Sequence, residues 1–487
     1  MTLIENLSAW ASPLAFDDVP DRVVRFASSQ VLSQLAAARA GVAHPLGQAV
    51  VRGFGQPWQH NAAQSAFVLA GLTSWLHFDD TAYAGHLSNS TVNVPLAYAH
   101  ALGLDGRQLL TAVIAANECA ARITAAATLG PFRGQNAAHT HVAGAVSGRL
   151  RAEGAPVEEW INALGLAFSM PPRPFLPAFL GSDAKVLSAA IPVRMGLDAC
   201  DAARAGLAGP SDILEHPDGF LANFSSVPLP DAVDRDLGRR WHTETLSFKI
   251  HPGGPGLDGA VDCAKELRRA LGTLRVDDVT EVVVTTSMYT LVVDQKAAAF
   301  LDAERSPVSA LVFCTPYAVA TALLTGDLVG ADFAAPAVAD DDRWRLAAKI
   351  TLEHDGEMTR ESLLSEAPFG EALRQAGPRA AKWLEEVGTQ WLVDLVGELP
   401  APSESFETAT KATPARVEVR LSNGEVHSRE LTIPVGAIGP HTRANHAELV
   451  RAKFLGVGGR DDVADIAATL PTATAQDVHA MLERALA

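Results

Sequence analysis

The sequence is poor in cysteine, in aromatic residues and in positive charge, and each shortage excludes a class of protein. Its four cysteines are far apart and show no C-x-x-C spacing, which indicates neither a disulfide framework nor a thiolate zinc site. Lysine and arginine total 39 against 56 acidic residues, a net charge of −17, and no basic run is present that would neutralise nucleic-acid phosphates. An anionic ligand would therefore have to be held by a few local cations.

Long hydrophobic runs are also missing. No uninterrupted apolar stretch reaches the roughly 18 residues that a membrane span needs. The first residues, Met1 to Glu5, lack the basic and apolar regions of a signal peptide. We therefore expect a cytoplasmic protein that has neither a nucleic-acid partner nor a membrane partner.

What the chain does contain favours closely packed helices. Alanine is abundant, whereas aromatic residues make up 6% and charged residues 20% of the 487 residues. The helix expected from Asp105 has the clearest signals, because Asp105 and Gln108 can form a capping box and Glu118 can pair with Arg122 one turn later. Further helical periodicity is present in residues 21–38, 62–76, 141–151, 158–167 and 183–205.

The pattern changes after about Trp241. Residues 281–286 and 348–353 are typical of strands and flank an apolar helix near 312–324. Asn423-Gly424 between two alternating segments predicts a hairpin, since this pair tolerates the positive φ of a type I′ turn. Helical patterns return at 446–454 and 475–486. We predict a mainly α fold with an α+β second domain: an all-helical domain of residues 1–243, against which 437–487 packs, and an α+β domain of residues 244–436.

One ten-residue stretch, His77 to His86, concentrates two histidines, two aspartates, a threonine and a tyrosine between two helical segments. Titratable groups at this density are typical of a site. A capped helix end explains the same pattern, because Asp79 or Asp80 can accept the N–H groups of a following turn.

Three later segments have a similar character. Lys185 is predicted in the first turn of a helix, where the helix dipole disfavours a cation, so a carboxylate ligand docked there would explain it. A lysine whose stem covers apolar surface is the alternative. Lys249 precedes a Pro-Gly-Gly loop, and Tyr317 begins another apolar helix. Arg133 and Arg173 lie in Gly/Pro-rich surroundings and are further candidates for carboxylate contacts, with solvated surface arginines as the alternative.

Taken in order, these segments resemble the MmgE/PrpD family, which includes 2-methylcitrate dehydratase, cis-aconitate decarboxylase and iminodisuccinate epimerase. The resemblance spans nearly the whole chain. It implies a cofactor-free homodimer with a large helical domain, a smaller α+β domain and an active site between them. It rests on Phe78-Asp79-Asp80-Thr81 with His86, Gly144-Ala145 after Thr140-His141, Asp183-Ala184-Lys185 with residues 206–210 beyond it, Phe248-Lys249, and Tyr317 ahead of residues 322–326.

The resemblance implies catalytic roles for His86, Lys185, Lys249 and Tyr317. Substrate-binding positions are expected at His77, Asp80, Thr81 and His141. The chain also departs from the decarboxylase-like pattern: His77 stands where those members have an aspartate, and two of their histidines fall near Gln135 and Gly254. The register near Gln135 leaves His141 or His139 as the source of that imidazole.

The resemblance implies chemistry next to a carboxylate of a small di- or tricarboxylic acid. Lys185 and Lys249 would stabilise the carbanion, and His86 would transfer the proton. Elimination of water, decarboxylation and epimerisation all fit, and so does a non-catalytic family member. A metal-dependent hydrolase is a further alternative, but no His-Asp dipeptide is present among its candidate ligands, so we predict no metal site. Those candidates are His77, Asp79, Asp80, His86, His139 and His141.

Overall fold

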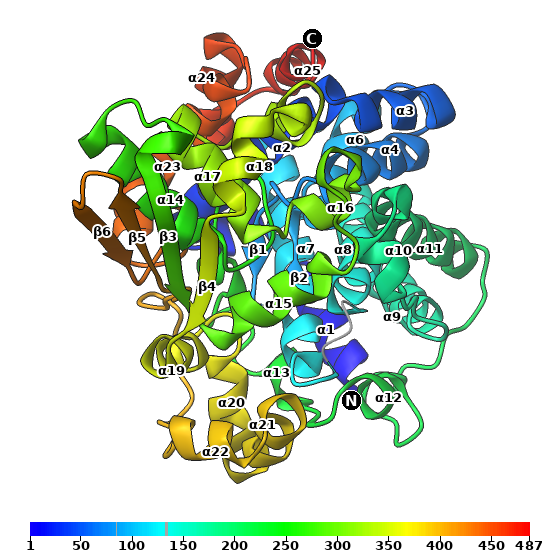
Figure 1. Cartoon of the computed structure of the whole chain (residues 1–487). Helices are drawn as coiled ribbons and strands as arrows, with labels where there is room; N and C mark the ends of the chain where they lie inside the picture. Colours follow the sequence, from blue (N-terminus) through cyan, green and yellow to red (C-terminus); the bar gives the residue numbers. More distant parts are fainter. Residues whose placement is uncertain (84, 132–134) are drawn as a thin grey trace.

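The protein is described by a computed structural model of residues 1–83, 85–131 and 135–487, with the side chains of residues 135–137 left aside. Helices form the first half of the chain and return at its end, and a mixed sheet lies at one side of the molecule (Figure 1). The predicted fold class, a large helical part with a smaller α+β part, is confirmed. The exact domain boundaries stay a prediction.

Helix α7 (Gly106–Ala127) is the central element of the helical part. Asp105 accepts the backbone N–H of Gln108, whose side chain accepts the N–H of Asp105, so the predicted capping box is confirmed. Almost every residue of α7 is buried, and its small alanine side chains let α8 (Gln135–Glu153) and α2 (Asp21–Ala43) approach closely. In the described part of the chain, α7 is the one helix long and apolar enough to cross a membrane, but that window is wholly buried inside the protein, as in a core helix.

The remaining elements before the sheet are mostly helical. They are α1 (Leu3–Ala11), α3 (Pro45–Phe54), α4 (Ala62–Ser74), β1 (Thr81–Ala82), β2 (Gly85–His86), α5 (Ser88–Thr91), α6 (Asn93–Leu102), α9 (Val157–Ala167), α10 (Leu176–Leu180), α11 (Leu187–Arg204), α12 (Phe220–Phe224) and α13 (Asp231–Asp234).

The helix expected over 183–205 begins differently from the prediction. Residues Asp183–Val186 form a 3₁₀ turn, and α11 starts only at Leu187 and contains Pro192. Ser182 caps this turn by accepting the N–H of Ala184. The turn matters for the site because it carries Lys185.

Gly196 on α11 marks a close approach to α8. A Cβ at this position would lie 2.8 Å from the carbonyl oxygen of Val142 and 2.9 Å from Cβ of Ala145. Gly196→Ala is therefore expected to lower the free energy of unfolding by about 1–3 kcal/mol through overpacking, as measured by denaturant unfolding. Gly53→Ala, on exposed α3 where a Cβ meets nothing within 4 Å, is the control and should leave the protein unchanged or up to about 1 kcal/mol more stable. Equal effects of the two changes would contradict the close approach.

The sheet has the strand order β4-β3-β5-β6, with β3 parallel to β4 and antiparallel to β5. Its strands are β3 (Val279–Thr286), β4 (Ile350–His354), β5 (Ala415–Leu421) and β6 (Val426–Leu431). The predicted hairpin between β5 and β6 is confirmed, but its turn is not the expected type I′, because Gly424 has a positive φ and Asn423 does not. Two helices, α14 (Asp258–Leu271) and α17 (Thr315–Thr325), contact each other, α14 contacts β5 and β6, and α17 contacts β4.

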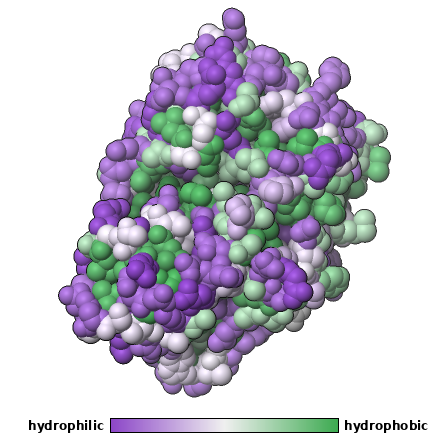
Figure 2. All heavy atoms as spheres, turned by 45° about the horizontal axis from the view of Figure 1, so that its top comes forward, coloured by the Kyte–Doolittle hydropathy of each residue, from purple (hydrophilic) through white to green (hydrophobic). Residues whose placement is uncertain are grey.

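The remaining helices of this part are α15 (Met288–Ala298), α16 (Val308–Leu311), α18 (Asp341–Ala347), α19 (Gly356–Leu364), α20 (Gly370–Ala376), α21 (Ala380–Gly388) and α22 (Gln390–Val396). The chain ends with α23 (Pro440–Gly456), α24 (Asp461–Ala468) and α25 (Ala475–Ala485), of which α23 and α24 contact α2 and α25 contacts α6. Figure 2 turns the top of the molecule toward the viewer, and on this face hydrophobic residues form patches among hydrophilic ones.

Candidate active site

A short hairpin after α4 positions the first site residues. Thr81 in β1 pairs with His86 in β2, so the two side chains are brought to one place although five positions separate them. His77, just before the hairpin, has a φ of +50°, a region that side-chain-bearing residues rarely adopt. Backbone strain of this kind persists where the surrounding structure enforces it and concentrates at functional sites.

A second contact brings distant segments to this hairpin. Thr81 exchanges two backbone hydrogen bonds with Ser247, at 3.1 and 2.9 Å, and this bridge places the following residues, up to Lys249, beside the hairpin. From the segment before β5, Lys411 donates to Oγ1 of Thr81 at 2.9 Å. The site is therefore assembled from parts of the chain more than 300 residues apart.

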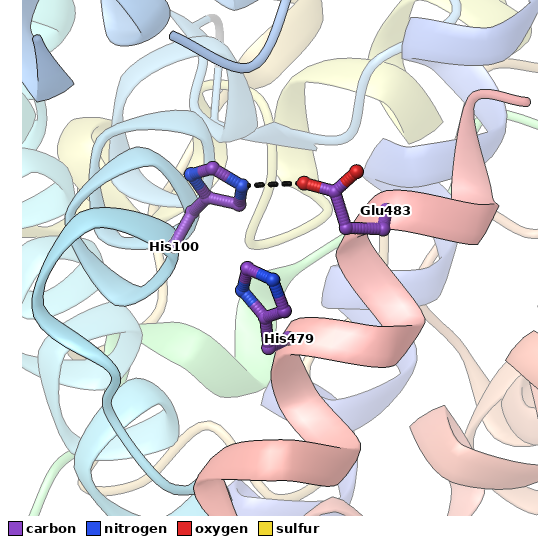
Figure 3. Close-up of side chains that lie close together, drawn as sticks. All are labelled: His100, His479 and Glu483. Carbon is purple, nitrogen blue, oxygen red and sulfur yellow. Dashed lines mark hydrogen bonds and ion pairs between the residues drawn. The ribbon is translucent and has the colours of Figure 1, made fainter. Parts of the chain in front are cut away.

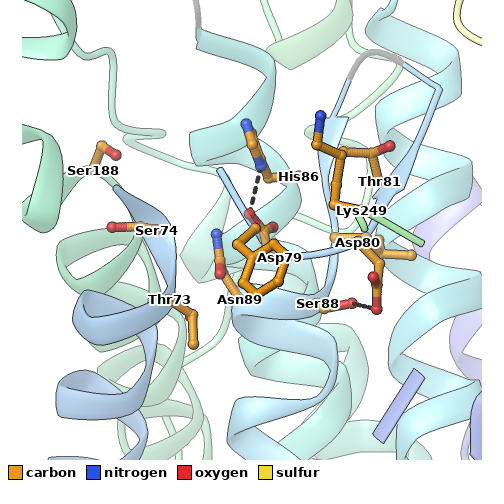
Figure 4. A network of polar contacts seen from close by, with 12 residues as sticks. Thr73, Ser74, Asp79, Asp80, Thr81, His86, Ser88, Asn89, Ser188 and Lys249 are labelled. Carbon is orange, nitrogen blue, oxygen red and sulfur yellow. Dashed lines mark hydrogen bonds and ion pairs between the residues drawn. The ribbon is translucent and has the colours of Figure 1, made fainter. Parts of the chain in front are cut away.

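His86 and Asp79 form a hydrogen-bonded pair at the centre of this network (Figure 4). Nδ1 of His86 lies 2.8 Å from Oδ1 of Asp79, which is completely buried. The aspartate thereby orients the ring and leaves Nε2 as the nitrogen available for proton transfer. The second oxygen of Asp79 has no hydrogen-bond partner among the described residues. In Figure 4 the side chains of His86 and Lys249 extend to the same side of the network.

Two more buried imidazoles flank this pair. The ring of His77 lies 4.4 Å from that of His86 and 4.6 Å from that of Phe313. Burial and the neighbouring Lys185, His86 and Lys249 hold the pKa of His77 well below its usual value. Burial, His86 and Lys185 do the same to the pKa of His141. Both rings are thus neutral.

These imidazoles also have unused hydrogen-bonding capacity. Within the described part of the chain, both ring nitrogens of His77 and Nδ1 of His141 lack a partner. Buried polar groups are nearly always hydrogen-bonded, so a group of orphaned atoms in one place indicates that a polar ligand or water completes them.

Lys185 is the least compensated cation of the site. It is 2% exposed, its ammonium lies 3.9 Å from the centroid of the Phe179 ring, and its hydrogen bond to Oγ of Ser188 is long, at 3.4 Å. Burial lowers the pKa of Lys185 to about 7, and the charge of Asp79 only partly opposes this. Arg173 lines an open groove whose wall also contains Phe179 and Ser188.

Lys249 and Lys411 form a second cationic group. Lys249 makes an ion pair with Asp258, and a small cleft is lined by both lysines, Asp258 and Thr413. Burial, reinforced by the charge of Lys249, lowers the pKa of Lys411 to about 8. Neither Lys411 nor Asp258 was predicted from the sequence, because no local pattern singles them out.

The carboxylate oxygens of Asp80 accept hydrogen bonds from other residues of the chain. Ser33 donates to it at 2.6 Å and Ser88 at 3.4 Å, and the ammonium of Lys453 lies 3.8 Å away. Burial raises the pKa of Asp80 to about 6. These contacts connect the hairpin to α2, α5 and α23, and the substrate contact expected of Asp80 stays a prediction.

Other predicted residues make contacts outside this group. The hydroxyl of Tyr317 donates to the carbonyl of Asp332 at 2.6 Å, and its ring packs on Trp344. Its catalytic role stays a prediction. The ring of His139 packs edge-on against Phe224 at 4.5 Å, whereas His141 interacts electrostatically with His86 and Lys185. The choice of His141 over His139 as the site imidazole stays a prediction. Among the described residues, no three of the six His/Asp candidates for a metal cluster bring their ligand atoms within 4.8 Å of one another.

Three further sequence expectations concern altered or uncertain positions. A Cβ at Gly254 would lie 2.1 Å from the ring of Phe313, so Phe313 occupies the space that a side chain there would need. Phe313 also packs on His77. Arg133 and the side chain of Gln135 lie outside the described residues.

The site has a surplus of positive charge when all its lysines are protonated. Four buried ammonium groups then share three carboxylates, and the group consists of Lys185, Lys249, Lys411 and Lys453 with Asp79, Asp80 and Asp258. An anionic ligand would neutralise the surplus. The apolar rings of Phe179 and Phe313 lower the local dielectric and strengthen that attraction.

Comparison with known proteins identifies the family of the chain. The family model of the MmgE/PrpD N-terminal domain matches residues 5–231, which include His77, His86 and Lys185. That of the MmgE/PrpD C-terminal domain matches residues 251–375, within the part that carries the sheet. No individual curated protein matches the chain. The two matches together cover most of the sequence, and the chain therefore belongs to the MmgE/PrpD family.

Proposed function

We propose that the protein is a cofactor-independent lyase that acts next to a carboxylate of a small di- or tricarboxylic acid. Family membership by itself suggests a dehydratase-type or related enzyme. The proposed lyase mechanism rests on one observation, the convergence of a His–Asp pair with a surplus of buried ammonium groups. Such a surface binds a polyanion and stabilises further negative charge that forms on it.

In the proposed reaction, Nε2 of His86 removes a proton from the carbon next to a carboxylate. The resulting charge spreads onto the carboxylate oxygens, where Lys185 and Lys249 face it. Elimination also requires a proton for the leaving hydroxyl. Lys185 can donate it, because the pKa of about 7 makes its ammonium a stronger acid than that of an exposed lysine.

Epimerisation is the second candidate, since it needs only the proton steps. Two observations support epimerisation as a candidate. The site has neutral imidazoles at His77 and His141, and residue 254, where decarboxylase-like members have a histidine nearby, is a glycine. In this reaction the ring of His77 or His141 would donate its N–H to the opposite side of the substrate carbon and recover a proton from water. Decarboxylation needs no initial proton removal and is the third outcome to be tested.

A single experiment separates these reactions. The protein is incubated in deuterated water with 2-methylcitrate, cis-aconitate and iminodisuccinate, and products are analysed by NMR and mass spectrometry. Elimination gives an unsaturated acid, decarboxylation releases carbon dioxide, and epimerisation incorporates deuterium without loss of mass elsewhere. Absence of all three with every acid that binds in a thermal-shift assay would overturn the lyase proposal.

A non-catalytic relative remains as the alternative from a different class. It would bind the acid without turning it over. Lys185→Ala separates the two, because loss of turnover supports an enzyme, whereas unchanged ligand binding with no activity in either form supports a binding protein.

Lys411 is expected to bind a second carboxylate of the substrate. Lys411→Met should raise KM by about 10- to 100-fold and leave kcat nearly unchanged. The reason is that the lost charge-assisted hydrogen bond stabilises the bound substrate and the transition state equally. Steady-state kinetics measure this, with Lys382→Met as control because exposed Lys382 only contacts the carbonyl of Ser226. A fall in kcat with unchanged KM would assign Lys411 to the chemical step instead.

The homodimer that the family resemblance implies is also a proposal. Met170 and Phe175, between α9 and α10, are 80% and 75% exposed, and large apolar side chains at this exposure suit a protein interface. Light scattering coupled to size-exclusion chromatography tests it: a mass near 51.3 kDa, that of one chain, would contradict the dimer.

A further inference from the structure

Three side chains with metal-binding atoms meet between α6 and α25, outside the candidate active site (Figure 3). His100 lies in the last turn of α6. His479 and Glu483 are four residues apart on α25 and therefore lie on one face of that helix. One ligand atom from each residue lies within 4.8 Å of the others. In the part of the chain that the structure describes, this is the one such group of histidine, cysteine and carboxylate side chains.

Neighbouring residues hold His100 and α25 in place, and the other two side chains are open to solvent. The ring of His100 is stacked between Trp58, 5.3 Å away, and His479, 5.0 Å away, which restricts its rotation. Helix α25 is held in place because Arg39 donates to the carbonyls of Ala485 and Ala487. His479 and Glu483 are themselves exposed, so an ion can reach them from solvent.

The contacts within the group go beyond an ordinary ion pair. His100 Nε2 lies 2.7 Å from Oε1 of Glu483, which alone would form such a pair. His479 is not needed for it, yet its ring lies against His100 with an interplanar angle of 23°. The arrangement thus brings a second imidazole to a histidine and a carboxylate.

We propose that His100, His479 and Glu483 bind one divalent transition-metal ion, with Zn²⁺ as the best fit. Two imidazole nitrogens and one carboxylate oxygen are ligands that zinc prefers, and water would complete a tetrahedron. With metal–ligand bonds of about 2.0–2.1 Å, tetrahedral ligand atoms lie roughly 3.4 Å apart. Rotation of the two exposed side chains of α25 closes the group to that size. The ion would fasten the C-terminal helix α25 to α6.

Calorimetric titration of the metal-free full chain with Zn²⁺ tests this proposal. The wild type is expected to bind one more ion per chain than His479→Ala. The matched control is His427→Ala on β6, which removes an exposed histidine 3.4 Å from Glu425 and should keep the wild-type stoichiometry. Any ion that binds at His77 or His86 is common to all three proteins and cancels in the comparison. Equal stoichiometry in the wild type and His479→Ala would overturn the site.

Thermal unfolding provides an independent readout. Saturating Zn²⁺ should raise the Tm of the wild type and of His427→Ala by a few degrees, because the ion binds the folded chain. Glu483→Gln should show little of this increase while its metal-free Tm stays near that of the wild type. A full increase in Glu483→Gln would exclude the carboxylate as a ligand and contradict the proposal.

Discussion

Replacing Lys185 by methionine is expected to remove most of the activity and to raise the Tm. The ammonium faces the developing charge, and losing one such preorganised group costs about 10²- to 10³-fold in kcat. Methionine has a similar length but no charge to desolvate, so the folded state no longer carries the cost of burying a cation beside Phe179. Steady-state kinetics and thermal unfolding of the same preparation measure both effects.

The pH dependence of this variant follows from the lowered pKa of Lys185. Between about pH 7 and 10.5 the folded chain has lost a proton that the unfolded chain still holds. The cost of burying the charge is therefore complete below pH 7 and disappears as the pH rises to 10.5. The gain in Tm of Lys185→Met should be largest near pH 6 and shrink above pH 7. A constant gain across this range, or a similar gain from the exposed control Lys382→Met, would contradict the assignment.

The pH dependence of the wild-type activity should also reflect the protonation of Lys185. Because the protonated form of Lys185 faces the substrate, kcat/KM is expected to fall as the pH rises above about 7. A bound polyanion stabilises the ammonium form of Lys185 and raises its pKa. The decrease in kcat should therefore begin at a higher pH than the decrease in kcat/KM.

His86→Gln is expected to lower kcat by about 10²- to 10⁴-fold, the usual contribution of a positioned acid–base group. Glutamine keeps an amide that can contact Asp79 but cannot accept and return a proton. Deuterium incorporation at the substrate carbon should fall by the same factor, whichever reaction the protein performs. The affinity for a substrate acid, measured by thermal shift, should change only a few-fold.

Asp79→Asn provides the graded comparison for His86→Gln. It keeps the shape of the pair but removes the charge that orients the ring, so its activity should lie between that of the wild type and His86→Gln. His216→Gln, at an exposed histidine whose ring accepts the N–H of Asp218, is the matched control and should be fully active. Undiminished deuterium incorporation in His86→Gln would assign proton removal to another group.

Much of the fold could be predicted because its signals are local. The capping box at Asp105 and the hairpin at Asn423-Gly424 each depend on a few adjacent residues, and both form where expected, although the turn type differs. The 3₁₀ turn at Asp183 was not predicted, since small residues continue the helical pattern through it. Helices α20 to α22 were also missed, because they are short and lie between proline and glycine residues.

The site was predictable only in part. His77, His86 and Lys185 were identified because they stand out among apolar neighbours. Lys411 could not be found in this way, because its role depends on a contact with Thr81, 330 positions away. Tyr317 was suggested by family resemblance, and its hydroxyl donates to the backbone carbonyl of Asp332, so its role stays a prediction.

The uneven sharing of three carboxylates by four lysines has a practical consequence for anyone who purifies this protein. Citrate, phosphate or sulfate in a buffer would bind the same ammonium groups and act as competitive inhibitors. Kinetic constants measured in such buffers would then describe displacement of the buffer anion. Preparations in a bulky, weakly coordinating zwitterionic buffer should reveal the full rate and the lowest apparent KM.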